Sequence, residues 1–166
     1  MKPSSGRSMM YSKSYPKTIA IVKASWHGPT VDAFARSCRE DLEHSEVPLL
    51  VSEYEVPGVV EIPLFCQKLI DRSNPDLIVV VGLIADHGVY RHDFVASSVM
   101  DAVMTLQMQT GTPIIYGILT PQDFMSEGRE AFFLEHFVIK GKEAATASLK
   151  TLENEVLLAE MSREAG

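Results

Sequence analysis

The arrangement of apolar residues along the chain constrains its fold more than any other feature of the sequence. From residue 17 onward, short apolar runs alternate with longer segments in which apolar residues recur at helical spacing. Because strands that alternate with helices usually form a parallel sheet, the pattern predicts a layered α/β fold with a mainly parallel sheet. The most apolar run should lie inside that sheet. Four runs have the length of strands: residues 18–25, 47–56, 77–83 (the most apolar) and 112–119.

Helices are expected between and after these strands. The first should be capped by Thr30, the second should cover residues 59–72, and the third residues 91–109. The remainder has helical spacing, with an expected break at residues 137–139 before a final helix from residue 141.

The 91–109 segment carries two apolar stripes on roughly opposite sides of the expected helix. The second stripe is covered either by a neighbouring subunit or by another helix of the same chain. The first stripe contains Phe94, Val95, Val99, Ala102, Val103 and Leu106, and the second contains Met100, Met104 and Met108.

Composition limits the classes of protein to which the chain can belong. Its 166 residues suit one domain, expected at residues 17–166 behind a mobile tail of residues 1–16. Acidic residues outnumber basic ones by 22 to 15, so a nucleic-acid or anionic-membrane partner is not expected. No apolar run approaches the roughly 20 residues of a membrane helix. Cys38 and Cys66 lie on apolar helix faces, as buried free thiols do, so we expect a soluble protein of the reducing cytoplasm.

Unusual residues gather in the loops that follow the strands, where ligands bind in open parallel sheets. Trp26 follows the first strand and could stack on a flat heterocycle, or could simply cover the edge of the sheet. Glu61 follows the second and could accept hydrogen bonds from substrate hydroxyls. Alternatively, Glu61 serves only the dipole of the helix that it begins.

The loop after the third strand concentrates charge at the start of a helix. His87, Arg91 and His92 could form an anion or phosphate site there together with the exposed N–H groups of the helix. Alternatively, the loop is a solvated segment, salt-bridged through Asp86 and Asp93. A looser basic set follows nearer the end of the chain: Arg129, His136 and Lys140.

Several kinds of chemistry lack their motifs. The sequence contains neither a Gly-x-Gly-x-x-Gly dinucleotide motif nor a Gly-Lys-Ser/Thr phosphate loop. Histidines and cysteines do not have the spacing of a metal site, and neither cysteine falls where a nucleophile is expected. Of the kinds of catalysis considered, the sequence leaves acid–base catalysis and the orientation of substrates, without a cofactor or a metal.

Five segments together resemble the 6,7-dimethyl-8-ribityllumazine synthase family, in its order and near its spacing, between residues 17 and 158. The loop 88–95 and the pair Trp26 and His27 are similar to the divergent second type of that family. The resemblance implies a three-layer flavodoxin-like domain that forms pentamers, or a dimer of pentamers in the second type, with active sites between subunits. The five segments are residues 56–63 (VPGVVEIP), 81–84 (VGLI), 92–95 (HDFV), 113–120 (PIIYGILT) and 140–145 (KGKEAA).

The resemblance also implies a reaction and roles for individual residues. Family members condense 5-amino-6-(D-ribitylamino)uracil with 3,4-dihydroxy-2-butanone 4-phosphate in riboflavin biosynthesis, without a cofactor. By position, Trp26, beside His27, would stack on the pyrimidine, whose edge would meet backbone groups of Leu83 and Ile84, with Tyr116 on the pocket wall. The ribityl chain would be held by Gly58, Val59, Val60 and Glu61. Candidates for the phosphate are His87, Gly88, Arg129, its competitor His136, and Lys140.

The loop departs from the family pattern where the chemistry would occur. Val89 replaces a threonine, and Arg91 stands where the family has a proton-shuttling histidine. A guanidinium stays protonated near neutral pH, so His92 is the better candidate for proton transfer, with Arg91 beside it. Three hypotheses follow: a slow lumazine synthase, a flavin- or lumazine-binding or sensing protein with little catalysis, and a homologue recruited to another carbonyl condensation.

Overall fold

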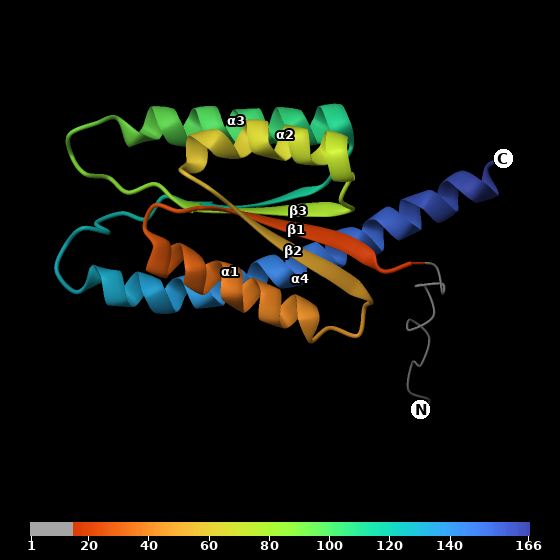
Figure 1. Ribbon diagram of the computed structural model, residues 1–166, viewed down its shortest axis with the longest axis horizontal. Helices are drawn as coiled ribbons and strands as arrows, with labels where there is room; N and C mark the ends of the chain where they lie inside the picture. The colour runs from red at the N-terminus through yellow and green to blue at the C-terminus, as the bar shows by residue number, and fades with distance from the viewer. Residues whose placement is uncertain (1–14) are drawn as a thin grey trace.

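Four strands form the middle layer of the molecule, and a pair of helices covers each face of the sheet (Figure 1). The structure is a computed structural model and describes residues 15–166, so the expected tail lies outside the described residues except for Tyr15 and Pro16. The strands are β1 (Lys17–Ala24), β2 (Leu49–Val56), β3 (Leu77–Leu83) and β4 (Ile114–Leu119). The helices are α1 (Gly28–Glu43), the 3-10 turn η1 (Val59–Glu61), α2 (Ile62–Ser73), α3 (His92–Thr110) and α4 (Arg129–Glu164).

The strands pair in the order β2-β1-β3-β4, and every pairing is parallel. All seven residues of β3 are buried, and Val80 at its centre lies between Val22 of β1 and Tyr116 of β4. The predicted parallel sheet, with residues 77–83 inside it, is therefore confirmed. Because all four strands run the same way, their carboxyl ends and the loops that follow them lie along one edge.

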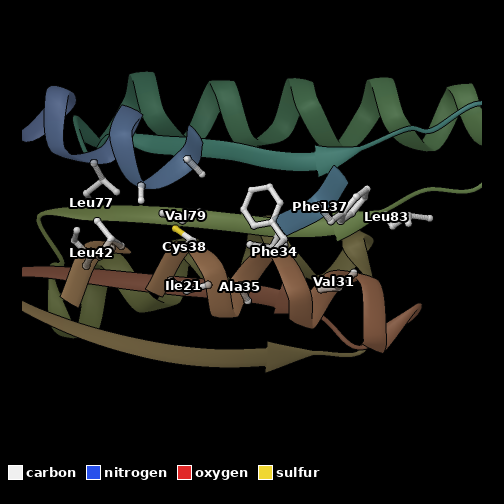
Figure 2. Close-up of a cluster of buried hydrophobic side chains, with 14 of the residues drawn as sticks. Ile21, Val31, Phe34, Ala35, Cys38, Leu42, Leu77, Val79, Leu83 and Phe137 are labelled. Atoms are coloured by element: carbon white, nitrogen blue, oxygen red, sulfur yellow. The ribbon is translucent and has the colours of Figure 1, made fainter. Parts of the chain in front are cut away.

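One face of the sheet packs against α1 and α4 (Figure 2). The rings of Phe34 in α1 and Phe137 in α4 meet edge to face, with centroids 6.3 Å apart. Gly117 of β4 makes room for this pair, because a Cβ there would lie 2.6 Å from Cζ of Phe34. The Phe34–Phe137 contact therefore packs α1 against α4 on this face of the sheet.

The other face packs against α2 and α3, through Ile62, Val99 and Val103. The thiols of Cys66 on this side and Cys38 on the other are free and buried, as the apolar helix faces predicted. Burial raises the pKa of each thiol to about 12, so neither is a thiolate near neutral pH. None of the helices between residues 15 and 166 has both the length and the apolar character needed to cross a bilayer.

Two expected helix boundaries are wrong. The helix α1 begins at Gly28, so Thr30 lies buried within its first turn and does not cap it. Pro29 stabilises this earlier start because its fixed φ suits the first turn of a helix. The N-cap position belongs to His27, which is in the left-handed conformation with φ of 58°.

The expected break at residues 137–139 is also absent, because α4 is continuous from Arg129 to Glu164. Contacts with α1 hold this stretch in the helix. Ser37 Oγ donates a hydrogen bond to the Val138 carbonyl oxygen at 2.5 Å, and a Cβ on Gly141 would collide with the Phe34 carbonyl oxygen. Gly141 therefore permits close helix packing, which overrides its low helix propensity.

Fewer residues of the first α3 stripe are buried than the sequence predicted. The buried face consists of Val99, Val103 and Leu106, whereas Phe94 is 58% exposed. The second stripe is exposed, from 47% at Met100 and Met104 to 81% at Met108. Another helix among residues 15–166 does not cover it, so that alternative is wrong.

Candidate active site

The first two strand-end loops are fastened to each other at the carboxyl edge of the sheet. The Ser25 backbone N–H donates to the Val56 carbonyl oxygen at 2.9 Å, and its hydroxyl donates to the Pro57 carbonyl oxygen at 2.8 Å. At the other side of this edge, the Ile84 N–H donates to the Leu119 carbonyl oxygen at 2.9 Å. These bonds fix the loops that carry the candidate residues.

Trp26, Gly58 and Glu61 form one corner of this edge. The indole is 72% exposed, so it does not close the core. A Cβ on Gly58 would lie 3.9 Å from the indole and 3.1 Å from Glu61 Oε2, which places all three side by side. The Gly58 N–H donates to Glu61 Oε2 at 2.9 Å. A carboxylate has about four lone-pair sites, so Glu61 keeps capacity to accept from hydroxyl groups.

The floor of the corner is apolar and depends on a glycine in β3. A Cβ on Gly82 would come within 2.5 Å of Val59 Cγ1, so only glycine lets η1 settle against the strand. Val59, Leu83 and Ile84 are buried, whereas the next residue of η1, Val60, is 62% exposed. The buried side chains leave the backbone as the part of this segment available to a ligand.

The loop after β3 contains the ion pairs that one reading of the sequence predicted. Arg91 Nη2 lies 3.2 Å from Asp93 Oδ2, and this hydrogen bond lowers the pKa of the Asp93 carboxyl. The Arg91 guanidinium also lies 3.9 Å from the centroid of the Phe94 ring. His92 Nδ1 lies 3.6 Å from Asp86 Oδ1. Exposed pairs of this kind contribute little to stability.

The structure brings His27 and His87 together from separate loops. Their rings stack with centroids 6.0 Å apart, and Phe124 meets His27 edge to face at 5.3 Å. Burial lowers the pKa of His27, the nearby His87 lowers it further, and Glu130 acts in the opposite direction. His27 therefore favours its neutral form, in which one ring nitrogen can donate and the other accept.

Phe124 connects this pair with the start of α4. Its ring centroid is 5.6 Å from that of Phe133, and the guanidinium of Arg129 lies 5.0 Å from the Phe133 centroid. The Nε of Arg129 is buried without a hydrogen-bond partner among the described residues. Sequence reasoning missed Phe124, and its only signal was an aromatic residue three positions after Pro121 in a strand-end loop.

Comparison with known proteins identifies the family to which the chain belongs. The family described as 6,7-dimethyl-8-ribityllumazine synthase matches residues 16–155. The chain is 40% identical over 138 residues to 6,7-dimethyl-8-ribityllumazine synthase 2 of Bradyrhizobium diazoefficiens, covering 82% of this chain and 83% of that protein. It is 36% identical over 148 residues to the 6,7-dimethyl-8-ribityllumazine synthase of Rhodococcus erythropolis, covering 88% and 96%. The chain belongs to the lumazine synthase family.

A further relative carries the same designation as the first. Lumazine synthase 2 of Pseudomonas syringae pv. tomato is 36% identical over 148 residues, covering 85% of each chain. The matched range contains every motif on which the resemblance rested and every candidate site residue.

The remaining candidates of this lumazine synthase family member come from α4 and β4. His136 stacks on Phe132 at 5.9 Å, two helical turns after Arg129. Lys140 is 11 residues after Arg129 on α4, about 16 Å along the helix, and pairs with Glu143 at 2.7 Å. Tyr116 lies within β4, opposite Val80, where burial raises its pKa.

An apolar cleft of roughly 460 Å³ opens between the η1–α2 segment and α3. It shares Val60 with the ribityl-segment candidates and begins beside the first turn of α3. Sequence reasoning placed no site there, although half of its lining was visible as the outer part of the first α3 stripe. The lining residues are Val60, Pro63, Leu64, Phe94, Val95, Ser98, Val99 and Ala102.

Proposed function

We propose that the protein is an enzyme that condenses 5-amino-6-(D-ribitylamino)uracil with 3,4-dihydroxy-2-butanone 4-phosphate to give 6,7-dimethyl-8-ribityllumazine. The observation that carries this proposal is the corner of Trp26, Gly58 and Glu61, which offers an exposed aromatic face beside a partly occupied carboxylate. That arrangement suits a flat heterocycle bearing a polyhydroxylated chain. The proposal requires no cofactor and no metal.

The corner would orient the pyrimidine substrate through three kinds of contact. Trp26, beside His27, provides a rigid stacking surface for the ring. Glu61 accepts hydrogen bonds from ribityl hydroxyls, which lie along the backbone of Gly58, Val59 and Val60. Backbone groups of Leu83 and Ile84 meet the polar edge of the pyrimidine. Because two substrates must be held together, orientation alone supplies much of the rate.

The phosphate of the second substrate would bind at the loop after β3. Gly88 offers a flexible backbone, and His87 and Arg91 offer donors at the beginning of α3. The buried, unpartnered Nε of Arg129 makes it the strongest basic candidate of α4, ahead of His136 and Lys140. A cationic pocket stabilises phosphate as it leaves, which is the step that completes the elimination.

His92 would transfer the protons of the condensation. Its ring takes the proton released when the substrate amine attacks the ketone, and returns it to the hydroxyl that departs as water. Phosphate elimination and ring closure with loss of a second water then give the lumazine. Arg91 stays protonated and contributes charge to the same site.

The site would be completed in a homo-oligomer, either a pentamer or a dimer of pentamers. The exposed Met100, Met104 and Met108 support a subunit contact on α3. The apolar cleft, on another side of this helix, offers a second apolar surface to a neighbouring subunit. A second subunit would also supply Tyr116, Arg129, His136 or Lys140 to the corner. We place the enzyme in the cytoplasm.

Turnover tests the proposal directly. The purified full chain is mixed with both substrates, and lumazine formation is followed by fluorescence against the uncatalysed reaction. A rate indistinguishable from the uncatalysed one would contradict the proposed function. Omission of either substrate is the control for intrinsic fluorescence.

A second function is favoured by the loop itself, which has Val89 where a phosphate-binding hydroxyl is expected and an arginine in place of the shuttling histidine. This candidate is a protein that binds or senses flavins or lumazines and has little catalysis. Titration with riboflavin and with the lumazine separates the two functions. Tight binding without turnover supports the sensor, and turnover with weak product binding supports the enzyme.

A further inference from the structure

One carboxylate in the loop after β3 faces two groups at once. Asp86 Oδ1 accepts a hydrogen bond from the Gly88 N–H at 2.8 Å and lies 3.6 Å from Nδ1 of His92. Gly88 has φ of 70°, a left-handed conformation that glycine adopts without strain. The loop thus turns back and brings the carboxylate beside the first residue of α3.

The other charged groups of the loop have partners of their own. Arg91 is held by Asp93 at 3.2 Å and by the ring of Phe94. His87 is stacked on His27. Two carboxylates and two basic side chains are thereby divided into separate pairs, Asp93 with Arg91 and Asp86 with His92.

We propose that Asp86 is a positioning residue for His92. The carboxylate holds the proton of the neutral imidazole on Nδ1, which leaves Nε2 with a free lone pair for proton transfer. The inference rests on the proposed function, in which His92 moves the proton. The separation of 3.6 Å is longer than a hydrogen bond, and catalytic contacts of this kind commonly shorten only when substrate is bound.

The alternative role for Asp86 is purely local, because an aspartate that bonds to the N–H two residues later stabilises a turn in any loop. Asp86→Asn separates the two roles. Asparagine keeps a side-chain oxygen that can accept the Gly88 N–H, and it loses the charge that attracts the imidazole. A residue that only shapes the turn would therefore tolerate this change.

A double-mutant cycle tests the proposal. We expect Asp86→Asn to lower kcat about tenfold while KM for each substrate changes less than about threefold. In a His92→Ala background the same change should lower kcat by less than about twofold more. An equal fall in both backgrounds, or an unchanged kcat when His92 is present, would overturn the proposal. Asp101→Asn, which removes an exposed carboxylate from α3, is the control and should leave kcat unchanged in both backgrounds.

A second measurement does not depend on turnover. Nitrogen-15 NMR of the His92 ring above neutral pH should place the proton on Nδ1 in the original protein. Asp86→Asn should move it toward Nε2, the tautomer that free histidine prefers. The same tautomer in both proteins would overturn the proposal. If the original protein shows no turnover, the proposed function fails, and the tautomer still decides whether Asp86 orients His92.

Discussion

The ring of His27 stacks on that of His87, with centroids 6.0 Å apart and planes 18° from parallel. The two residues are 60 positions apart and come from the loops after β1 and β3, so the contact joins the stacking corner to the charged loop. Its chemical consequence is a pair of histidines that cannot both become charged without repulsion. Phe124, which meets His27 edge to face, supplies no charge, and only Glu130 raises the pKa of His27.

This pair makes stability depend on pH. The pKa of folded His27 is lowered by burial and by His87, so the unfolded state binds its proton more readily. Stability should therefore be full at pH above about 6.5, the unperturbed value, and should decrease as pH falls through that value toward the folded pKa. Urea unfolding at a series of pH values measures the trend.

His27→Asn is the informative variant, because asparagine tolerates the left-handed backbone of this position. The loss of stability between pH 7 and 5 should be smaller in the variant than in the original protein. Carboxylates contribute equally to both curves, so the difference between them isolates the histidine. Parallel curves would show that His27 is not the titrating group.

Trp26→Ala should weaken binding of the pyrimidine substrate and leave the fold intact. Stacking on a base contributes about 1–3 kcal/mol, so KM for this substrate should rise roughly 5- to 150-fold. Stability should be nearly unchanged, because the indole is 72% exposed. Trp26→Phe keeps an aromatic face and should recover much of the affinity. An unchanged KM in Trp26→Ala would show that the pyrimidine ring of the substrate does not stack on Trp26.

His92→Ala should lower kcat about 100-fold with a much smaller effect on substrate binding, as expected for loss of a proton-transfer group. His87→Ala should instead raise KM for the phosphate substrate. The two variants change histidines five positions apart, one in the loop after β3 and one at the start of α3, so each is the control for the other. If His92→Ala keeps full turnover and His87→Ala abolishes it, the assignment of the loop residues is wrong.

The sequence predicted those parts of the fold that depend on local patterns. Strand β3 was found to the residue because all its side chains are apolar and buried on both faces of the sheet. The start of α1 was missed because threonine is a common N-cap residue, which favoured Thr30. In the structure, Pro29 and the left-handed conformation of His27 let the helix begin earlier, at Gly28. The continuity of α4 depends on the contact of Gly141 with α1, more than 100 residues away, which no local pattern carries.

The candidate site was predictable to a similar extent. Placing it at the strand ends required only the rule that parallel strands share an edge. The neighbouring positions of Trp26, Gly58 and Glu61 followed from that rule. The link from His27 through Phe124 to Phe133 did not, because it joins three separate segments of the chain through side-chain packing.

Met104→Glu should disrupt the proposed homo-oligomer. Met104 is 47% exposed in the middle of the methionine stripe, and a charge buried at a subunit contact costs several kcal/mol. Sedimentation velocity should show a smaller particle than that of the original protein, with the helical content unchanged. Lys142→Glu on the exposed side of α4 is the matched control. An unchanged sedimentation coefficient for Met104→Glu would remove α3 from the interface.

Gly141→Ala should destabilise the fold, although alanine is the better helix former. Helix propensity alone favours alanine by about 1 kcal/mol. The new Cβ would collide with the Phe34 carbonyl oxygen and Ser37 Oγ, both held in α1, and such overpacking costs about 1–3 kcal/mol. Chemical denaturation should therefore give a lower free energy of unfolding.

Gly28→Ala provides the comparison, because a Cβ at that position in the first turn of α1 meets nothing within 4 Å. This variant should be neutral or stabilised by up to about 1 kcal/mol, since alanine restricts the unfolded chain more than glycine does. Opposite signs for the two substitutions would establish that helix contact at Gly141, and not propensity, keeps α4 against α1. A stabilised Gly141→Ala would show that the two helices can separate at little cost.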